Sequence, residues 1–142
     1  MSKTSKQGDV AVARFLYEFT LHGVQVALPL SDSLCYDMLI DFNNHVSRVQ
    51  CKSATRSDGD KLSVKLQRTH VLSERNVYKN YAEEDFDLLA VYDAVKDKCY
   101  LLPSSAWANK GGITLWFRPT REKQSLLCRD FELSVVLQTI NK

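Results

Sequence analysis

The chain has 142 residues, of which 44% are hydrophobic and 25% are charged, a composition that fits one globular domain spanning residues 1–142. Its formal net charge of +2 is too small to indicate nucleic-acid binding by itself, so a basic surface would have to arise from local clusters. No apolar run approaches the length of a transmembrane helix, and residues 1–6 lack the apolar region of a signal peptide, so we expect a cytoplasmic protein that does not enter a membrane.

The first part of the chain predicts a helix and a strand. Residues 8–22 carry apolar side chains at spacings that fit a helix buried on one side, and Gly23 is a suitable helix stop. Residues 24–28 alternate between apolar and other side chains, which predicts a strand ending at Pro29. The four cysteines show neither CxxC spacing nor a matching histidine pair, so we expect reduced thiols rather than a zinc site.

Residues 36–52 predict a β-hairpin that brings polar groups together. Asn43-Asn44 suits its turn, because asparagine tolerates a positive φ angle. Strand alternation puts Gln50 and Lys52 on one face, leaves Cys51 on the other, and brings Asp37 alongside. A carboxylate, an amide oxygen and an ammonium would then converge at one sheet edge. This spacing is a weak pattern, and taken alone it fits a solvated polar strand face better.

The remaining chain predicts further strands and helices. Strands are expected over 61–67, 86–92, 99–102 and 113–117, a loop with a short helix over 70–81, and helices at 104–107 and 130–140. The hairpins require antiparallel neighbours, so the pattern excludes a doubly wound parallel sheet. The expected fold class is α/β, with a mixed sheet flanked by helices.

Several short motifs carry a family resemblance. Tyr36-Asp37 followed by Gln50-Cys51-Lys52 resembles the signature of the PD-(D/E)XK nuclease superfamily, in its Q-x-K form. Together with Gly8-Asp9-Val10, Leu28-Pro29-Leu30 and the stretch 87–103, the chain is similar to homing endonucleases encoded in group I introns of bacteria. The resemblance covers roughly residues 8–103 and implies a restriction-endonuclease-like core.

The resemblance also implies roles for the hairpin residues. Asp37, the side-chain oxygen of Gln50 and the backbone carbonyl of Cys51 would hold Mg²⁺, since all are hard oxygen donors. Lys52 would stabilise the charge on the attacked phosphate, so the expected catalytic residues are Asp37, Gln50 and Lys52.

One position departs from the family pattern. The superfamily usually places a glutamate on the first helix, about four residues after a glycine, and counting from Gly8 that position holds Val12. Asp9 lies one helical turn before Val12 and is a possible substitute, whereas Glu18 lies on a different face of the helix.

Basic and polar residues after the hairpin are candidates for DNA contact. They are Arg56, Lys61, Lys65, Gln67 and Arg68. Alternation places Lys61, Lys65 and Gln67 on one strand face, as expected for a strand that enters a DNA groove, whereas Arg68 falls on the other face of a regular strand. An ordinary solvated face is the alternative.

The function expected from the resemblance is site-specific, Mg²⁺-dependent cleavage of both strands of double-stranded DNA for intron homing. Another nuclease of the superfamily, such as a restriction enzyme or a Holliday junction resolvase, is an alternative, as is a degenerate DNA-binding protein. A double-strand break requires two active sites, so we expect a homo-oligomer, a dimer or a tetramer. The part after residue 103 is expected to serve oligomerisation or DNA contact through Trp107, Trp116 and Phe117, unless these side chains are core.

Overall fold

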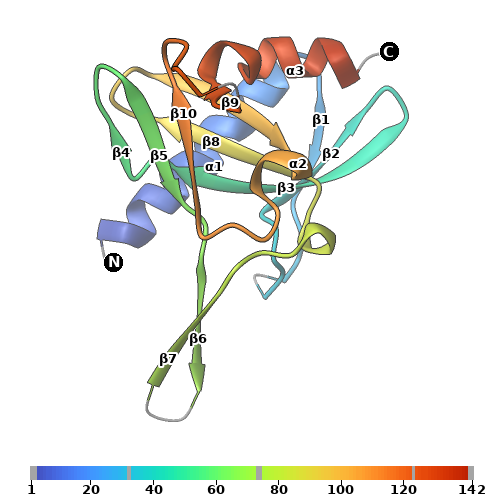
Figure 1. Ribbon diagram of the computed structural model, residues 1–142. Helices are drawn as coiled ribbons and strands as arrows, with labels where there is room; N and C mark the ends of the chain where they lie inside the picture. The colour runs from blue at the N-terminus through green and yellow to red at the C-terminus, as the bar shows by residue number, and fades with distance from the viewer. Residues whose placement is uncertain (1–2, 32, 73–74, 123, 141–142) are drawn as a thin grey trace.

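A five-stranded mixed sheet forms the centre of the protein, as Figure 1 shows. The computed structural model describes residues 3–31, 33–72, 75–122 and 124–140. The strand order is β1-β2-β3-β8-β9, with β3 and β8 parallel and all other neighbours antiparallel. The strands are β1 (Gln25–Ala27), β2 (Met38–Phe42), β3 (His45–Ser53), β8 (Leu88–Asp93) and β9 (Lys98–Pro103). The predicted mixed sheet is confirmed.

The β2–β3 hairpin turns at the two asparagines that the sequence indicates. Phe42 pairs with His45, so the turn contains only Asn43 and Asn44, with φ angles of 54° and 64°. Both residues adopt the left-handed conformation, which matches the twist of a two-residue hairpin turn. The turn fixes the register of β2 against β3.

Two helices, α1 (Lys3–Leu21) and α3 (Leu133–Ile140), cover one face of this sheet. Phe15 and Phe19 of α1 are fully buried, with their ring centroids 5.8 Å apart. Strand β8 contributes Leu88 and Ala90 to this core and its intervening residues to the opposite core. A parallel strand buried on both faces explains why this segment reads as a continuous apolar run.

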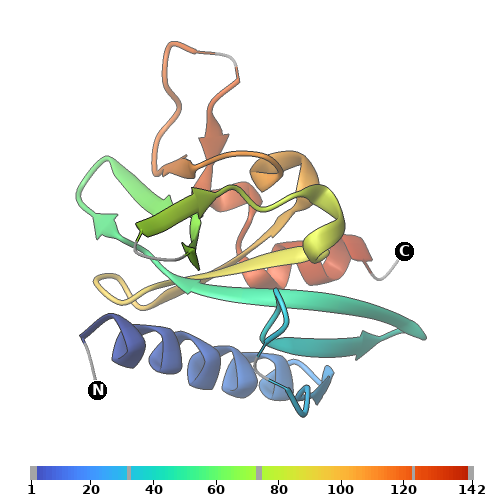
Figure 2. The same ribbon diagram turned by 90° about the horizontal axis from the view of Figure 1, so that it is seen from below.

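A second, four-stranded sheet and the short helix α2 (Ser104–Trp107) cover the opposite face, as Figure 2 shows. Its order is β11-β10-β5-β4, with β4 (Arg56–Ser57), β5 (Lys61–Lys65), β10 (Gly112–Trp116) and β11 (Leu126–Leu127). Leu62, Val64 and Leu66 are buried, as their alternation predicts. The two-residue strands β4 and β11 have no clear sequence signal.

Trp107 belongs to this second core. Its side chain is fully buried and stacks on Phe86 with a ring-centroid distance of 3.9 Å. The expectation that Trp107 forms an oligomer or DNA contact is therefore wrong, because hydrophobic burial within the domain already uses its surface. Trp116 and Phe117 are only partly buried.

A two-stranded ribbon extends away from the body of the protein (Figure 1). It consists of β6 (Arg68–Leu72) and β7 (Arg75–Lys79). The prediction of a loop with a short helix over 70–81 is wrong; the nearest helical turns are η1 (Glu83–Asp85) and, later, η2 (Cys128–Asp130). β-Branched residues favour strands here, but neither helical nor strand periodicity is sustained, so the pairing partner decides the structure.

None of the helices in the described ranges has the length and apolarity needed to cross a bilayer.

Candidate active site

Asp37 is held against β3 by two hydrogen bonds. Its backbone N–H donates to the carbonyl of Val49 at 2.8 Å, which continues the β2–β3 ladder by one residue. Its carboxylate Oδ2 accepts the backbone N–H of Cys51 at 2.8 Å. The register set by the asparagine turn thus places the carboxylate beside the middle of the Gln50-Cys51-Lys52 motif.

The alternation predicted for β3 is confirmed. Val49 and Cys51 are buried in the core beneath α1. Gln50 and Lys52 project from the other face and are half-buried. Burial raises the pKa of the Cys51 thiol well above its usual value, so this side chain stays a neutral core group and only its backbone serves the site.

Ionisation of the Asp37 carboxyl group is less favourable here than for an aspartate in water. Burial raises its pKa above the usual value, while the hydrogen bond from Cys51 and the nearby charge of Lys52 lower it. Burial dominates, so the positive charge already present only partly compensates the desolvated carboxylate. An additional cation at this place would be stabilised by the same unbalanced charge.

A cleft of about 540 Å³ opens over these residues. Asp37, Gln50, Cys51 and Lys52 line it together with Lys65 and Gln67, which come from the end of β5 and the residues after it. Residues that are remote in sequence therefore meet on one concave surface. The predicted convergence of carboxylate, amide and ammonium is observed.

The first helix supplies the opposite side of the cleft. Asp9 and Val12 both line it, so the helix position expected to hold an acid does face the site, although valine occupies it. Asp9 is the acidic residue of this helix that lines the cleft. Glu18 is excluded, since it forms an ion pair with Arg14 at 2.8 Å outside the cleft.

The candidate DNA-contact residues divide into two groups. Lys65 and Gln67 line the cleft, whereas Arg56 and Lys61 lie outside it. The Arg56 guanidinium lies 3.9 Å from Asp58, and the Lys61 ammonium lies 5.3 Å from the centroid of the Trp116 ring. Arg68 opens the ribbon, but its side chain lies outside the described part of the structure. Lys65, at the end of β5, is therefore the basic residue of this candidate set that lines the cleft.

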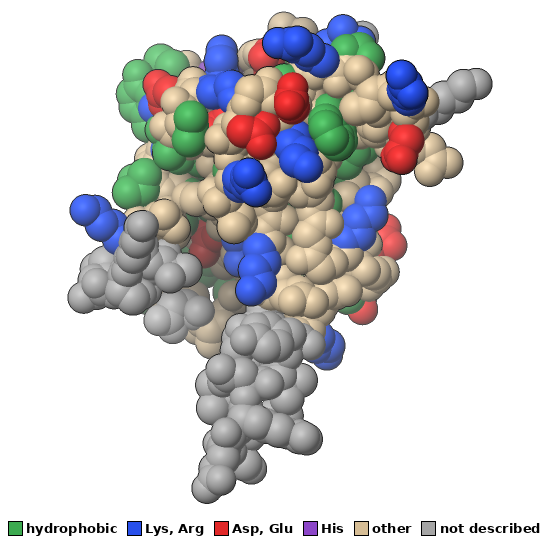
Figure 3. Space-filling view, turned by 60° about the vertical axis from the view of Figure 1, so that its left-hand side comes forward, with side chains coloured by type: hydrophobic (Ala, Val, Ile, Leu, Met, Phe, Trp, Pro, Cys, Tyr) green, Lys and Arg blue, Asp and Glu red, His purple; other side chains and the backbone are tan. Residues whose placement is uncertain are grey.

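The surface that bears β4 and β5 has mixed charge. Figure 3 shows Lys and Arg side chains spread over this face, with Asp and Glu side chains among them. This agrees with the net charge of only +2. Binding of a polyanion here would depend on where individual cations stand rather than on a uniformly positive field.

The donor set of the cleft suits a hard divalent cation. Asp37 offers a carboxylate, and the side chain of Gln50 and the backbone of Cys51 offer carbonyl oxygens, the ligand types that Mg²⁺ prefers. Within the described ranges, no cluster of three or more His, Cys, Asp and Glu side chains could hold a metal. A cation in the cleft would therefore rely on amide and backbone oxygens beside the carboxylate.

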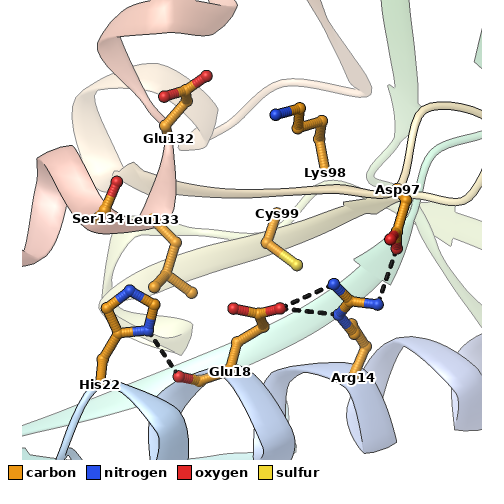
Figure 4. A pocket seen from close by; sticks show the side chains of 9 residues that line it. All are labelled: Arg14, Glu18, His22, Asp97, Lys98, Cys99, Glu132, Leu133 and Ser134. Atoms are coloured by element: carbon orange, nitrogen blue, oxygen red, sulfur yellow. Dashed lines mark hydrogen bonds and ion pairs between the residues drawn. The ribbon is translucent and has the colours of Figure 1, made fainter.

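A second hollow, of about 180 Å³, lies between α1, β9 and α3 and is drawn in Figure 4. There the Arg14 guanidinium lies 2.8 Å from Glu18 and 2.7 Å from Asp97, so its charges are already paired. The adjacent Cys99 thiol is half-buried, and its pKa is raised to about 11, chiefly by burial. This hollow offers a structural ion-pair network rather than an open set of ligands.

Two further polar residues of the cleft, Ser53 and Thr55, have no clear signal in the sequence. Ser53 donates a hydrogen bond from its hydroxyl to the carbonyl of Gln7 at 2.8 Å, which ties the end of β3 to α1. Thr55 accepts the backbone N–H of Lys65 through its hydroxyl at 3.0 Å. Strand periodicity places Ser53 on the buried face, so sequence alone would discard it.

Comparisons with known proteins agree with this geometry. The family model described as PD-(D/E)XK endonuclease matches residues 2–132. No curated protein matches the chain significantly. Among solved structures, the chain is similar to that of the bacterial homing endonuclease I-Ssp6803I, with a TM-score of 0.76 and 23% identity over 97% of this chain and 95% of that chain. At this identity the structural likeness shows a shared fold.

Proposed function

The chain belongs to the PD-(D/E)XK endonuclease family, and from this premise we propose that it is a site-specific, Mg²⁺-dependent endonuclease that makes double-strand breaks in DNA for the homing of a group I intron. The observation that supports the proposal most is the meeting of Asp37, Gln50 and Lys52 in one cleft, with the Asp37 carboxylate fixed by the Cys51 N–H. The fold shared with a bacterial homing endonuclease supports the choice of biological role.

The proposed reaction adds one water molecule across a phosphodiester bond. Asp37, the Gln50 side-chain oxygen and the Cys51 carbonyl would hold Mg²⁺, which supplies Lewis-acid charge and makes a bound water more acidic. Lys52 places its ammonium at the phosphate and stabilises the negative charge that grows on the phosphoryl oxygens. Asp37 and Gln50 also fix the position of the attacked group relative to Lys52.

DNA binding is proposed to involve Arg56, Lys61, Lys65, Gln67 and Arg68. Lys65 and Gln67 would contact the strand being cut, since they line the cleft itself. Arg56 and Lys61 would contact phosphates further along the duplex, and the ribbon that begins at Arg68, which projects from the body (Figure 1), would enter a groove. The active form is proposed to be a homo-oligomer, a dimer or a tetramer.

One observation favours a second candidate, a protein that binds DNA without cutting it. Val12 occupies the helix position where relatives carry an acid, and it lines the cleft. In this case the carboxylate of Asp9 would not compensate for the missing ligand.

A cleavage assay separates these candidates. The purified protein should cut double-stranded DNA that carries candidate intron-insertion sites, in both strands, when Mg²⁺ is present and not when EDTA replaces it. Binding without cleavage under all metal conditions would favour the DNA-binding candidate. Preference for a branched substrate over a plain duplex would indicate a junction resolvase, and cutting at short, frequent sites would indicate a restriction enzyme.

A further inference from the structure

Tyr81 lies next to the side chain of Lys52. The Lys52 ammonium stands 5.4 Å from the centroid of the Tyr81 ring, within the range of a cation–π contact. Tyr81 itself is 5% exposed, so its ring is held in the core, whereas Lys52 is one of the residues that line the cleft. The flexible stem of a lysine would otherwise leave the charge free to sample many positions.

The ring of Tyr81 is held by other aromatic residues. Its centroid lies 5.2 Å from that of Phe86 in an edge-to-face arrangement, and Phe86 stacks in turn on Trp107. Edge-to-face and stacked pairs have preferred geometries, so this row of rings fixes the orientation of Tyr81. The orientation of the Tyr81 ring beneath Lys52 is therefore set by these neighbouring rings.

Tyr81 is also joined to the base of the ribbon. Gln67 and Asn80 stand just before β6 and just after β7, and the Gln67 side-chain N–H donates to the Asn80 side-chain oxygen at 3.3 Å. Asn80 donates to the backbone carbonyl of Asn109 at 3.2 Å, and the Asn109 N–H donates to the carbonyl of Tyr81 at 2.8 Å. We call this set of hydrogen bonds the clasp.

A glycine makes room for the clasp. A Cβ at Gly111 would lie 3.2 Å from the Gln67 side-chain nitrogen and 3.5 Å from the Asn80 side-chain oxygen. By contrast, a Cβ at Gly59 would meet no atom within 4 Å. The two glycines therefore provide a matched pair of sites for perturbing the clasp and for controlling that perturbation.

We propose that Tyr81 is a positioning residue for Lys52, and that the clasp links this position to the base of the ribbon. The negative face of the ring holds the ammonium where it meets the phosphate. Since Tyr81 directly follows Asn80, a displacement of the ribbon base moves the platform of Lys52. The inference rests on the proposed function and goes beyond it, because it assigns a residue outside the Asp37, Gln50 and Lys52 set.

The test compares variants at position 81 in single-turnover cleavage and DNA binding. Tyr81→Leu should lower the cleavage rate about tenfold, as expected for a lost cation–π contact, with unchanged DNA affinity. Tyr81→Phe keeps the ring and should cleave as the unmodified protein does. Equal rates for the Leu and Phe variants would overturn the proposal, as would a Tyr81→Leu loss that appears only in DNA affinity.

A second replacement guards against loss of packing. Pentafluorophenylalanine keeps the shape of the ring but reverses its charge distribution, so at position 81 it should lower the cleavage rate and leave the melting temperature nearly unchanged. The same replacement at Phe19, which is fully buried in the opposite core beside Phe15, is the matched control and should not lower the rate. A full rate with the fluorinated ring at position 81 would also overturn the proposal.

A measurement without DNA separates this inference from the proposed function. The ε-methylene protons of Lys52 should show a ring-current shift in the NMR spectrum that Tyr81→Leu removes and Gly111→Ala reduces, whereas Gly59→Ala leaves it intact. Absence of the shift, or equal effects of the two glycine variants, would refute the Lys52 platform or its link to the clasp. If the unmodified protein cuts no DNA, the proposed function fails, while the NMR result still stands by itself.

Discussion

At the level of single residues, two aspartates that stand just before β2 and β8 have pKa values shifted in opposite directions. Burial raises the pKa of Asp37 above its usual value, against the effects of Cys51 and Lys52. Asp87 also feels burial, but its hydrogen bonds and ion pair with Arg48 outweigh this and lower its pKa. Charge on Asp37 therefore opposes folding, and charge on Asp87 favours it.

This contrast predicts opposite pH dependences of stability in metal-free buffer. As the pH rises through the titration of Asp37, the unfolded chain loses its proton first, so stability falls; Asp37→Asn removes this loss and should melt a few degrees higher than the unmodified protein at neutral pH. Asp87→Asn should melt lower at neutral pH, with the difference vanishing as the pH falls below the titration of this carboxyl. Thermal unfolding from neutral pH to well below 3.8, the ordinary pKa of an aspartate, measures both, and equal shifts of the same sign would contradict the prediction.

The same Asp37→Asn variant should lose cleavage with every divalent metal tried, because the cleft has few carboxylates with which to attract a cation. Gln50→Glu should be milder, within about tenfold of the unmodified rate, since it keeps an oxygen donor at the same place and adds charge. Cleavage rates over a metal titration measure both. If Gln50→Glu were as inactive as Asp37→Asn, the placing of Gln50 at the metal would be wrong.

Lys52→Ala should lower the cleavage rate by at least about 100-fold, the loss typical of removing one group that stabilises transition-state charge. DNA affinity should change by less than about tenfold, since binding is spread over many phosphate contacts. Single-turnover cleavage and fluorescence anisotropy measure the two quantities. Full cleavage by Lys52→Ala would remove this residue from the mechanism.

At the scale of elements, the hairpin of β2 and β3 could be predicted because its determinants are local. Asn43 and Asn44 set the turn, and alternation then decides which way Gln50, Cys51 and Lys52 point. This was sufficient to locate the candidate site. The family resemblance, rather than the spacing, distinguished that site from a polar strand face.

The ribbon and the surroundings of Lys52 could not be predicted in the same way. Strands β6 and β7 form by pairing with each other. The sequence of neither strand alternates regularly enough to distinguish a strand from a helix. Tyr81 meets Lys52 through tertiary packing across the second core, and no spacing in the sequence encodes that contact. Val12 lines the cleft, and the sequence offers Asp9 as a substitute for the missing acid without assigning it that role.

Strand β5 carries a prediction about DNA binding. Replacing Lys61 and Lys65 together by glutamine should weaken binding and reduce the slope of log K against log salt concentration by nearly two, since each lost phosphate contact lowers it by about 0.9. Lys98→Gln is the control, because Lys98 lines the separate hollow beside Arg14. This substitution should leave the slope unchanged. An unchanged slope in the double variant would show that β5 does not meet the DNA backbone.

The whole molecule is small in comparison with a rare DNA site. A compact chain of this length has a radius of gyration of roughly 14–15 Å and a diameter of about 35–40 Å. That distance covers about one turn of duplex, or roughly 10 base pairs. A site that occurs rarely requires contacts over more than one turn, and one active site cuts only one strand.

We therefore expect the active form to be at least a dimer, because two-fold assembly supplies both a second active site and a longer footprint. Light scattering with and without target DNA should give a mass of two or more chains. Cleavage of both strands by a monomer, with a rate linear in enzyme at limiting concentration, would contradict this expectation.

The clasp has a further consequence for the history of such a protein. The hydrogen bond between Gln67 and Asn80 holds the two ends of the ribbon side by side. The folded domain therefore offsets the loss of entropy on closing the loop between them. Segments between such fixed ends tolerate insertion and replacement, since few contacts of the core depend on their length. If the ribbon contacts DNA as proposed, recombination at this point would replace the DNA-contacting ribbon and leave the residues of the cleft unchanged.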